Sequence, residues 1–361
     1  MMDKEEIKHY LNTTDDESVA RLFQAADKLR HEYVGDQVHL RALVEISSFC
    51  RRGCAYCGLR SRNRDVRRYR MSAREILDCA LHAVRLGYGT VVLQGGEDPV
   101  FSSRRVADLV RRIISETGLA VTLSLGERST DELAEWRDAG ASRYLLRFET
   151  SDEFLFRAIH PLRPGQTGRH PRMELLREIE RLGYETGSGV MVGIAGQSYS
   201  TLADDLIAFT TLGLDMIGVG PWVPHPATPL AQTLPTEPIE QVPNSASMTL
   251  RVLALTRILC PDTNIPATTA LSTVGGDECL DSALRCGANV VMPDMTPSRY
   301  RADYSIYPGK QGFYQDTRRQ DELLKEKIRS LGLVPGTGPG NSRSWTNKQS
   351  ARLARAVGGV L

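Results

Sequence analysis

The sequence lacks several features that mark special classes of protein. Its 361 residues contain no apolar run of the roughly 18 residues that a membrane-spanning helix needs, and the charged N-terminus lacks the apolar core of a signal peptide. Neither sign of charge is in excess: 45 Lys and Arg face 44 Asp and Glu, so there is no general reason to expect binding to nucleic acid or to a membrane. The seven cysteines are an odd number in a long chain, which argues against a complete disulfide framework. We therefore predict a cytoplasmic protein in a reducing compartment.

The chain instead contains a repeated alternation of short apolar runs and amphipathic stretches. Its first forty residues have apolar side chains at helical intervals among charges, and eight apolar runs follow. The runs are Ala42–Ile46, Thr90–Leu93, Val121–Leu125, Tyr144–Leu146, Gly189–Ile194, Met216–Val219, Asn264–Ala267 and Asn289–Met292. The stretches between them include Ala73–Leu86, Ser103–Glu116, Thr130–Ala139, Arg172–Leu182, Tyr199–Leu212, Ser247–Leu259 and Asp277–Cys286. Such alternation predicts a parallel sheet whose strands are covered by helices.

Eight units are the number that closes a (β/α)8 barrel of the TIM type, and an open doubly wound sheet is the alternative fold. We predict an α/β chain in three parts: an N-terminal helical lead over 1–40, the barrel over 41–312, and a C-terminal helix and flexible tail over 313–361. The Pro-rich stretch Thr233–Ser247 is typical of a loop insertion. The Gly-, Ser- and Asn-rich sequence from Pro335 is typical of a mobile extension before a short helix.

Three cysteines stand close together directly after the first predicted strand. The segment ISSFCRRGCAYCGLR places Cys50, Cys54 and Cys57 at the spacing C-x3-C-x2-C. Soft thiolates favour zinc or iron–sulfur clusters, and a structural zinc site normally has a fourth Cys or His nearby, which this segment lacks. Three thiolates on a four-iron cluster leave one iron open to a further ligand. We therefore predict a [4Fe-4S] cluster, with a zinc loop or three unrelated thiols as the alternative.

The triplet resembles that of the radical S-adenosylmethionine (SAM) superfamily, with an aromatic residue, Tyr56, before the third cysteine. In that superfamily SAM binds the open iron, and an electron from the cluster cleaves SAM to give a 5′-deoxyadenosyl radical. A second segment agrees, because the second strand ends in Gln94-Gly95-Gly96-Glu97, similar to the GGE segment that contacts the methionine end of SAM. The resemblance implies an active site at the carboxyl ends of the barrel strands.

A more specific resemblance runs from about residue 40 to residue 312. The sequence is similar to the HydE family of [FeFe]-hydrogenase maturases in segments such as VEISSFCRRGCAYCGLRSRN, VVLQGGEDP, RYLLRFET, GPWVPHPATPLA, NIPATTAL and YPGK. Methylornithine synthase and biotin synthase share the barrel and the triplet but not this set. The resemblance implies a function in maturation of the hydrogenase H-cluster, with the radical acting on a small cysteine-bound iron complex that carries carbon monoxide and cyanide.

Two other functions remain open. One is a different radical SAM enzyme of the same barrel family, either a mutase or a sulfur-chemistry enzyme with an amino-acid-like substrate. The other is a protein that holds a cluster without turnover. For the maturase, the resemblance implies a small anionic organometallic substrate, a low-potential electron donor, and two partner maturases, a tyrosine lyase and a scaffold GTPase. We expect no nucleic-acid or membrane partner.

The functional residues of the family carry over by position. The resemblance implies that Cys50, Cys54 and Cys57 hold the cluster. It implies that Glu149 accepts hydrogen bonds from the SAM ribose and that Arg172 pairs with the SAM carboxylate. The full implied SAM set is Tyr56, Gln94, Glu97, Ser124, Glu149, Arg172, Met191, Pro224 and His225. The implied set around an internal anion-binding cavity is Arg143, Arg147, Thr268, Thr269 and Tyr300. Alternation in RYLLRFE supports part of this, since every second residue from Arg143 to Glu149 points the same way.

Several of these residues also have a purely structural interpretation. Arg147 and Glu149 suit an ion pair inside the barrel, although buried charges are costly unless they are paired or functional. The two threonines are ordinary β-formers at a strand end, and His225, which lies between prolines, suits a rigid loop contact. Residues 51–70 hold eight arginines against Asp65, a pattern more typical of a solvated loop than of a docking patch.

Two features depart from the family pattern. Phe148 stands where the family usually has histidine, and alternation places it on the helix-facing side, so we expect a change in packing. Some members carry cysteines after YPGK that bind a second cluster, whereas this sequence continues QGFYQDTRRQDELLKEK. The remaining cysteines, Cys79, Cys260, Cys279 and Cys286, are scattered over helical segments and suit packing. We therefore predict one cluster and no second one.

Overall fold

The computed structural model describes residues 2–161, 170–232, 240–310 and 318–358, and its side chains as far as residue 354. Within these residues, eight parallel strands follow one another around a nearly closed barrel in the order β6-β5-β4-β3-β2-β1-β8-β7. They are β1 (Gln37–Ser47), β2 (Thr90–Gly95), β3 (Ala120–Ser124), β4 (Arg143–Leu145), β5 (Glu185–Val192), β6 (Met216–Pro221), β7 (Pro266–Ala267) and β8 (Val290–Val291). A single bridge between Met216 and Asn264 joins β6 to the start of the β7 segment and completes the ring. The barrel, rather than the open doubly wound sheet, is confirmed.

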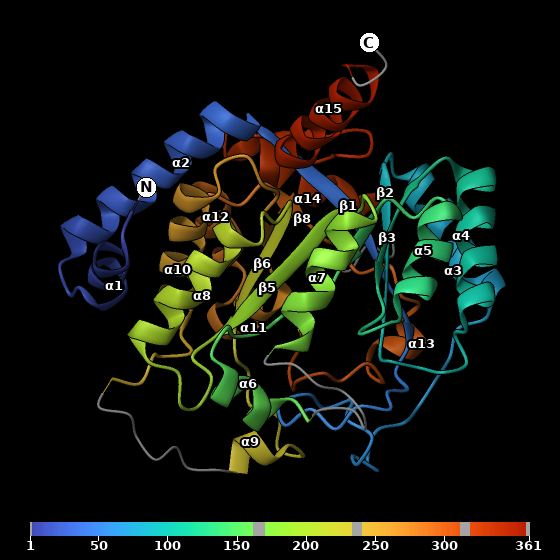
Figure 1. Cartoon of the computed structure of the whole chain (residues 1–361), viewed down its shortest axis with the longest axis horizontal. Helices are drawn as coiled ribbons and strands as arrows, with labels where there is room; N and C mark the ends of the chain where they lie inside the picture. Colours follow the sequence, from blue (N-terminus) through green and yellow to red (C-terminus); the bar gives the residue numbers. More distant parts are fainter. Residues whose placement is uncertain (1, 162–169, 233–239, 311–317, 359–361) are drawn as a thin grey trace.

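Helices cover the outside of the barrel (Figure 1). After the lead helices α1 (Lys4–Asn12) and α2 (Asp16–Val34), the outer layer consists of α3 (Ala73–Arg85), α4 (Ser103–Thr117), α5 (Thr130–Asp138), α7 (Pro171–Arg181), α8 (Tyr199–Thr211), α10 (Ala246–Leu259) and α12 (Glu278–Arg285). Each lies within two residues of an amphipathic stretch predicted above. Local sequence starts several of them, since α3, α5 and α8 each follow a serine whose hydroxyl accepts a backbone N–H of the first turn.

Four short helices have no counterpart in the predicted elements. They are α6 (Glu153–Ile159), α9 (Pro229–Gln232), α11 (Thr269–Gly275) and α13 (Ser298–Arg301), and each lies in the chain after a barrel strand. None is longer than seven residues, so none gives a readable helical period in the sequence. They lie in the loops at the carboxyl ends of the strands, the end at which barrel enzymes place their active sites.

The C-terminal part of the chain packs against the opposite end of the barrel. It comprises α14 (Arg318–Ser330), β9 (Val334–Gly336) and α15 (Arg343–Gly358), and β9 pairs with the start of β1. Between β9 and α15 the chain crosses the barrel floor, where the backbone N–H of Ser342 donates to Glu185 at 2.8 Å. The composition from Pro335 predicted a mobile extension, but the structure instead shows a segment tied to the barrel. We call residues 337–342 the floor segment.

A buried ion pair lies directly above the floor segment. The Arg143 guanidinium is fully buried and pairs with the Glu185 carboxylate, and it also donates to the carbonyl of Pro339 at 2.8 Å. Arg41 lies beside it and donates to the carbonyl of Gly340 at 3.0 Å. These bonds connect three barrel strands to the floor segment and satisfy charges that water does not reach.

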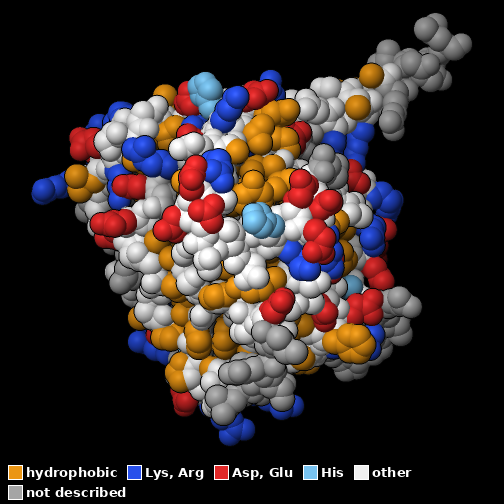
Figure 2. Space-filling model, turned by 90° about the vertical axis from the view of Figure 1, so that its left-hand side faces the viewer, with side chains coloured by type: hydrophobic (Ala, Val, Ile, Leu, Met, Phe, Trp, Pro, Cys, Tyr) orange, Lys and Arg blue, Asp and Glu red, His pale blue; other side chains and the backbone are white. Residues whose placement is uncertain are grey.

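No helix among the described residues is long and apolar enough to cross a membrane. On the face shown in Figure 2, acidic and basic side chains are interspersed, consistent with the net charge of +1. The predicted loop insertion Thr233–Ser247 and the boundary of the predicted parts at residue 312 lie partly or wholly outside the described residues. The division into three parts therefore stays a prediction.

Candidate active site at the carboxyl ends of the strands

The three cysteines lie on the loop that follows β1. Cys54 is buried, and Cys50 and Cys57 are half-buried. Gly96, at the end of β2, allows this loop to approach, because a Cβ there would lie 2.2 Å from the carbonyl oxygen of Phe49. The glycine of the GGE segment thus makes room for the cysteine loop.

Arginines of the cysteine loop stabilise it through hydrogen bonds to backbone carbonyls. Arg68 donates to the backbone carbonyls of Ser48, Leu59, Arg60 and Asn63. Arg52 is buried and donates to the carbonyl of Pro161 at 3.0 Å. Others of the eight arginines, such as Arg62 and Arg64, are exposed, as a solvated loop predicts. The run therefore combines a solvated surface with a folded internal scaffold, and the scaffold was not anticipated.

The donor set of the loop fits an iron–sulfur cluster. Burial raises the pKa of all three thiols, to about 11 for Cys54, and the neighbouring thiols raise the pKa of Cys57 further. Without a metal the three sulfurs are therefore neutral, and metal binding is what makes them thiolates. No three Cys, His, Asp or Glu side chains of the described residues converge closely enough to hold a single metal ion. Three soft thiolates on one loop are a donor set that suits an iron–sulfur cluster.

A cavity of about 270 Å³, the upper cavity, opens beside Cys57. Of the residues assigned to SAM, those that line it are Tyr56, Gln94, Ser124, Glu149, Arg172 and Met191. Glu97, Pro224 and His225 do not line it. His225 instead packs against Gly58, where a Cβ would lie 2.6 Å from its ring, and so supports the cysteine loop. The neighbouring residues Pro221, Trp222 and Val223 form the wall that β6 contributes.

Glu149 has the only positive φ of a non-glycine residue in the described part of the chain, at 68°. This left-handed conformation aims the carboxylate into the upper cavity, where Oε1 lies 3.5 Å from the Tyr56 hydroxyl. Its Oε2 lies 3.2 Å from Nε of Arg147 but accepts no well-oriented hydrogen bond from the described residues. A buried acceptor in this state favours a ligand that donates to it.

Two acidic side chains organise the region around the predicted SAM carboxylate site. Arg172 is buried and pairs with Glu127, with Nε 3.0 Å from Oε1, and Arg52 contacts the same oxygen at 3.2 Å. Glu97 accepts the backbone N–H of Glu127 at 2.9 Å and lies 3.4 Å from Arg51. Glu97 therefore connects the cysteine loop to the loop after β3. Glu127 had no signal in the sequence.

His160, at the end of α6, was also missed. Its Nε2 lies 2.8 Å from the Tyr56 hydroxyl and 3.5 Å from Sγ of Cys54. Burial and then the nearby Arg172 and Arg52 lower the pKa of His160 well below its ordinary value. The neutral ring therefore fixes Tyr56 without adding charge next to the cysteines.

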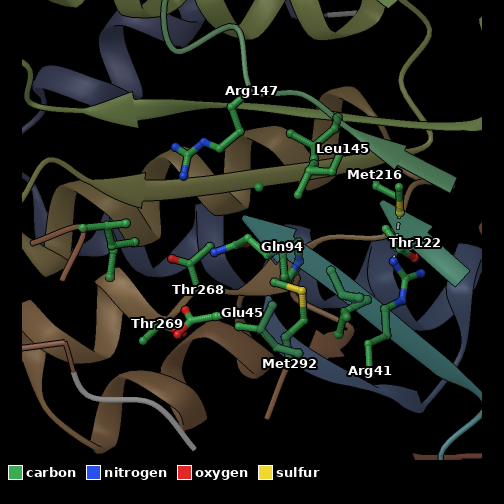
Figure 3. A pocket seen from close by; sticks show the side chains of 18 of the residues that line it. Arg41, Glu45, Gln94, Thr122, Leu145, Arg147, Met216, Thr268, Thr269 and Met292 are labelled. Carbon is green, nitrogen blue, oxygen red and sulfur yellow. Dashed lines mark hydrogen bonds between the residues drawn. The ribbon is translucent and has the colours of Figure 1, made fainter. Parts of the chain in front are cut away.

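A second cavity of about 150 Å³, the lower cavity, lies deeper in the barrel. Figure 3 shows its lining, to which Arg147, Thr268 and Thr269 contribute as assigned. Arg143 and Tyr300 do not line it. Arg143 lies in the floor ion pair, and the Tyr300 hydroxyl donates to Glu75 at 2.8 Å on the outer side of β1, where its ring stacks on Tyr69. Both cavities share Gln94, Leu145, Arg147, Ala270, Ile306 and Tyr307 as wall residues, so they adjoin.

Several buried polar atoms of the lower cavity form no hydrogen bond among the described residues. Among the described residues, no hydrogen bond is formed by the buried atoms Arg41 Nε, Glu45 Oε2, Thr122 Oγ1 and Arg147 Nε, and all four residues line this cavity. Native proteins rarely bury unpaired polar atoms, so their concentration in one cavity indicates a polar ligand. Arg41 and Glu45 were not predicted, although both lie on β1 at alternate positions that face inward.

Two packing predictions are confirmed. Phe148 is fully buried outside the cavities, with its ring 5.7 Å from that of Phe209. The four scattered cysteines, Cys79, Cys260, Cys279 and Cys286, are all buried free thiols.

Comparison with known proteins gives the family. Residues 44–207 match the family model of the Radical SAM superfamily. The [FeFe] hydrogenase maturase subunit HydE of Thermotoga maritima is 44% identical over 348 residues, which are 96% of this chain and 94% of that protein. This chain belongs to the HydE family. It is a radical SAM enzyme, and membership implies SAM and a [4Fe-4S] cluster, which suit the upper cavity and the cysteine loop.

More distant matches also cover most of the chain. The 3-methylornithine synthase of Methanosarcina barkeri is 28% identical over 331 residues, covering 91% of this chain and 88% of that protein. A crystal structure of methylornithine synthase (PylB) has a TM-score of 0.77 at 24% identity, with 93% of this chain and 94% of that chain covered. At this identity the structural similarity shows a shared fold, and it supports the barrel.

Proposed function

We propose that this HydE-family enzyme acts on a small cysteine-bound iron complex, carrying carbon monoxide and cyanide, during assembly of the [FeFe]-hydrogenase H-cluster. The observation that carries the proposal is the lower cavity. It adjoins the upper cavity, and its wall contains charged and hydroxyl side chains with buried polar atoms that form no hydrogen bond among the described residues. When bound, the cluster and SAM supply an electron and, by cleavage of a carbon–sulfur bond, a 5′-deoxyadenosyl radical.

The residues of the chain then have distinct roles in the proposal. Cys50, Cys54 and Cys57 hold the cluster, and Glu149 and Arg172 orient SAM in the upper cavity. Arg147 and Thr269 hold the anionic substrate through charge-assisted hydrogen bonds. Thr268, whose hydroxyl donates to the carbonyl of Val219, forms part of the cavity wall. The fully buried floor pair of Arg143 and Glu185 supports the retention of the substrate and the exclusion of water at that end. In this proposal Arg143 closes the barrel below the cavity and does not contact the substrate.

The proposal extends to cofactor number and partners. We propose a single cluster, because the four remaining cysteines are buried at separate places in the helical layer. In the region after YPGK, where a second cluster would be sought, residues 311–317 lie outside the described residues. As partners we propose a tyrosine lyase that supplies the iron complex, a scaffold GTPase that receives the product, and a low-potential electron donor in the cytoplasm.

The decisive experiment is maturation of an apo-[FeFe]-hydrogenase in vitro with and without this protein. We expect hydrogenase activity to depend on the protein, and 5′-deoxyadenosine to form with dithionite and SAM. Substitution of the three cysteines by Ala should abolish 5′-deoxyadenosine formation. Arg147→Ala should impair maturation but leave some uncoupled SAM cleavage, whereas full activity of this variant would remove Arg147 from the substrate site. SAM cleavage without any maturation would favour an amino-acid mutase, and no SAM cleavage would favour a non-catalytic cluster protein.

A further inference from the structure

Glu45 is a buried carboxylate that the function proposed above does not use. It lies on β1 in register with Gln94 of β2, is fully buried, and lines the lower cavity. One carboxylate oxygen, Oε1, pairs with Nζ of Lys310. The other, Oε2, accepts no hydrogen bond from any described residue. The side chain therefore presents an acceptor with an unused site in a cavity wall.

Two carboxylates, Glu45 and Asp294, lie around the Lys310 ammonium, and Arg301 adds a second positive charge nearby. Lys310 is the ammonium partner of two carboxylates, since Nζ also lies 3.6 Å from Oδ2 of Asp294, and Asp294 does not line the cavity. Burial raises the pKa of Glu45 to about 8, with Lys310 opposing the shift and Asp294 adding to it. A positively polarised N–H group in the cavity would offset this cost, because hydrogen bonds to a charged partner are stronger than neutral ones.

Other parts of the cavity wall have the opposite character. Arg147 supplies a guanidinium from the chain just after β4, and Thr269 supplies a hydroxyl group at the start of α11. The hydroxyl of Thr268 donates to the carbonyl of Val219 at 2.9 Å. Figure 3 shows the side chains of Glu45, Thr268 and Arg147 among those that line the same cavity. Among the described residues that line it, the lower cavity therefore combines an anion-binding part with one acceptor carboxylate. This is the pattern that a ligand with both a carboxylate and an amino group requires.

We propose that Glu45 recognises the amino group of an amino-acid-derived substrate, whether that group is a free ammonium or an amine bound to a metal, while Arg147 and Thr269 hold its carboxylate. The inference rests on the proposed function, which places the substrate in the lower cavity, and it names the part of the substrate that the site selects. An organic acid of the same size without the amino group would leave Glu45 Oε2 unpaired, and the site would reject it.

The test uses two thioethers that differ only in the amino group, S-methyl-L-cysteine and 3-(methylthio)propionate. They are titrated calorimetrically into the anaerobically reconstituted enzyme with SAM bound, so that the open iron is occupied. We expect the amino acid to bind about 10- to 100-fold more tightly, the range for one charge-assisted hydrogen bond. Equal affinities, or no binding of S-methyl-L-cysteine at millimolar concentration, would overturn the proposal without any variant.

Variants then assign the preference to Glu45. Glu45→Gln keeps the size of the side chain, and we expect it to reduce the preference to less than about threefold, with the affinity for 3-(methylthio)propionate unchanged. Asp294→Asn is the matched control, because it removes a charge from the same cluster outside the cavity wall, and it should keep the preference. If Glu45→Gln weakens both ligands equally, Glu45 serves only to hold Lys310 and the proposal fails.

Failure of this inference can be told from failure of the proposed function. Hydrogenase maturation with no preference between the two thioethers contradicts the role of Glu45 alone. A preference that depends on Glu45, combined with no hydrogenase maturation, contradicts the maturase function and retains an enzyme for an amino-acid-like substrate.

Discussion

Glu149 combines an unfavourable backbone conformation with a position in the upper cavity. A left-handed φ of 68° costs a residue with a Cβ about 1–2 kcal/mol, and proteins keep such residues mainly where function needs the side chain. We predict that Glu149→Gly raises the free energy of unfolding by about 1 kcal/mol and weakens SAM binding. Urea denaturation and SAM titration measure the two effects.

Glu149→Gln is the matched comparison for this prediction. It keeps the Cβ and hence the strain, so the free energy of unfolding should stay near that of the native chain while SAM binding weakens. If the glycine variant is no more stable than the glutamine variant, the backbone conformation stores no measurable strain.

At the residue scale, sequence reasoning identified groups that belong to contiguous motifs and missed groups that come from distant segments. The cysteine spacing predicted one loop, and alternation along RYLLRFE placed Arg147 and Glu149 on the cavity side, where both lie. Alternation predicts which face of a strand a residue lies on but not its depth in the barrel. It therefore did not predict that Arg143 lies below the cavities, in the floor ion pair. Glu45 and Lys310 are 265 positions apart, so only the closed barrel shows that they form a pair.

The strands β4 and β5 are connected at the barrel floor by the ion pair of Arg143 and Glu185. Removal of one partner from a buried pair leaves an uncompensated charge, which costs about 3–5 kcal/mol. We predict that Arg143→Leu lowers the free energy of unfolding by about this amount and that the double variant with Glu185→Leu recovers much of it. Chemical denaturation of the three proteins measures this.

The same variants separate the two roles considered for Arg143. A structural role predicts that the double variant, assayed below its unfolding transition, retains 5′-deoxyadenosine formation. If the Arg143→Leu protein is stable but no longer binds the substrate, Arg143 belongs to the substrate site instead.

At the scale of elements, periodicity was informative where an element was long enough to show it. All eight predicted strands overlap β1 to β8, and the seven longer outer helices were found with small errors at their ends. The floor segment was misjudged because Gly, Pro, Ser and Asn give the same composition to mobile chain and to tightly turned chain that uses its backbone for hydrogen bonds. The hydrogen bonds that Pro339 and Gly340 accept from Arg143 and Arg41 distinguish the two cases.

For the molecule as a whole, the join between the first strand and the C-terminal segment gives a pH dependence. Burial, followed by repulsion from Arg41 and Arg143, lowers the pKa of His39 from 6.5 to about 4. Between these two pH values the unfolded chain binds a proton that the folded chain does not, so stability is lost as the pH falls from about 6.5 to about 4. We predict a lower unfolding midpoint at pH 5.5 than at pH 7.5.

His39→Gln should reduce this loss, because the variant has no imidazole to protonate. The same substitution at the exposed His9 is the control and should leave the loss unchanged. Thermal unfolding at the two pH values measures both. If the unfolding midpoint of the His39 variant falls by the same amount between pH 7.5 and pH 5.5, other titratable groups cause the loss of stability.

Arg147 belongs to the walls of both cavities and contacts Glu149 in the upper one. An occupant of either chamber thus changes the surroundings of a charge that the other occupant also meets. Thermodynamics requires such an influence to be mutual: whatever factor the substrate applies to the affinity for SAM, SAM applies to the affinity for the substrate. Because both ligands meet the same guanidinium, the affinity of the enzyme for one ligand depends on whether the other is bound.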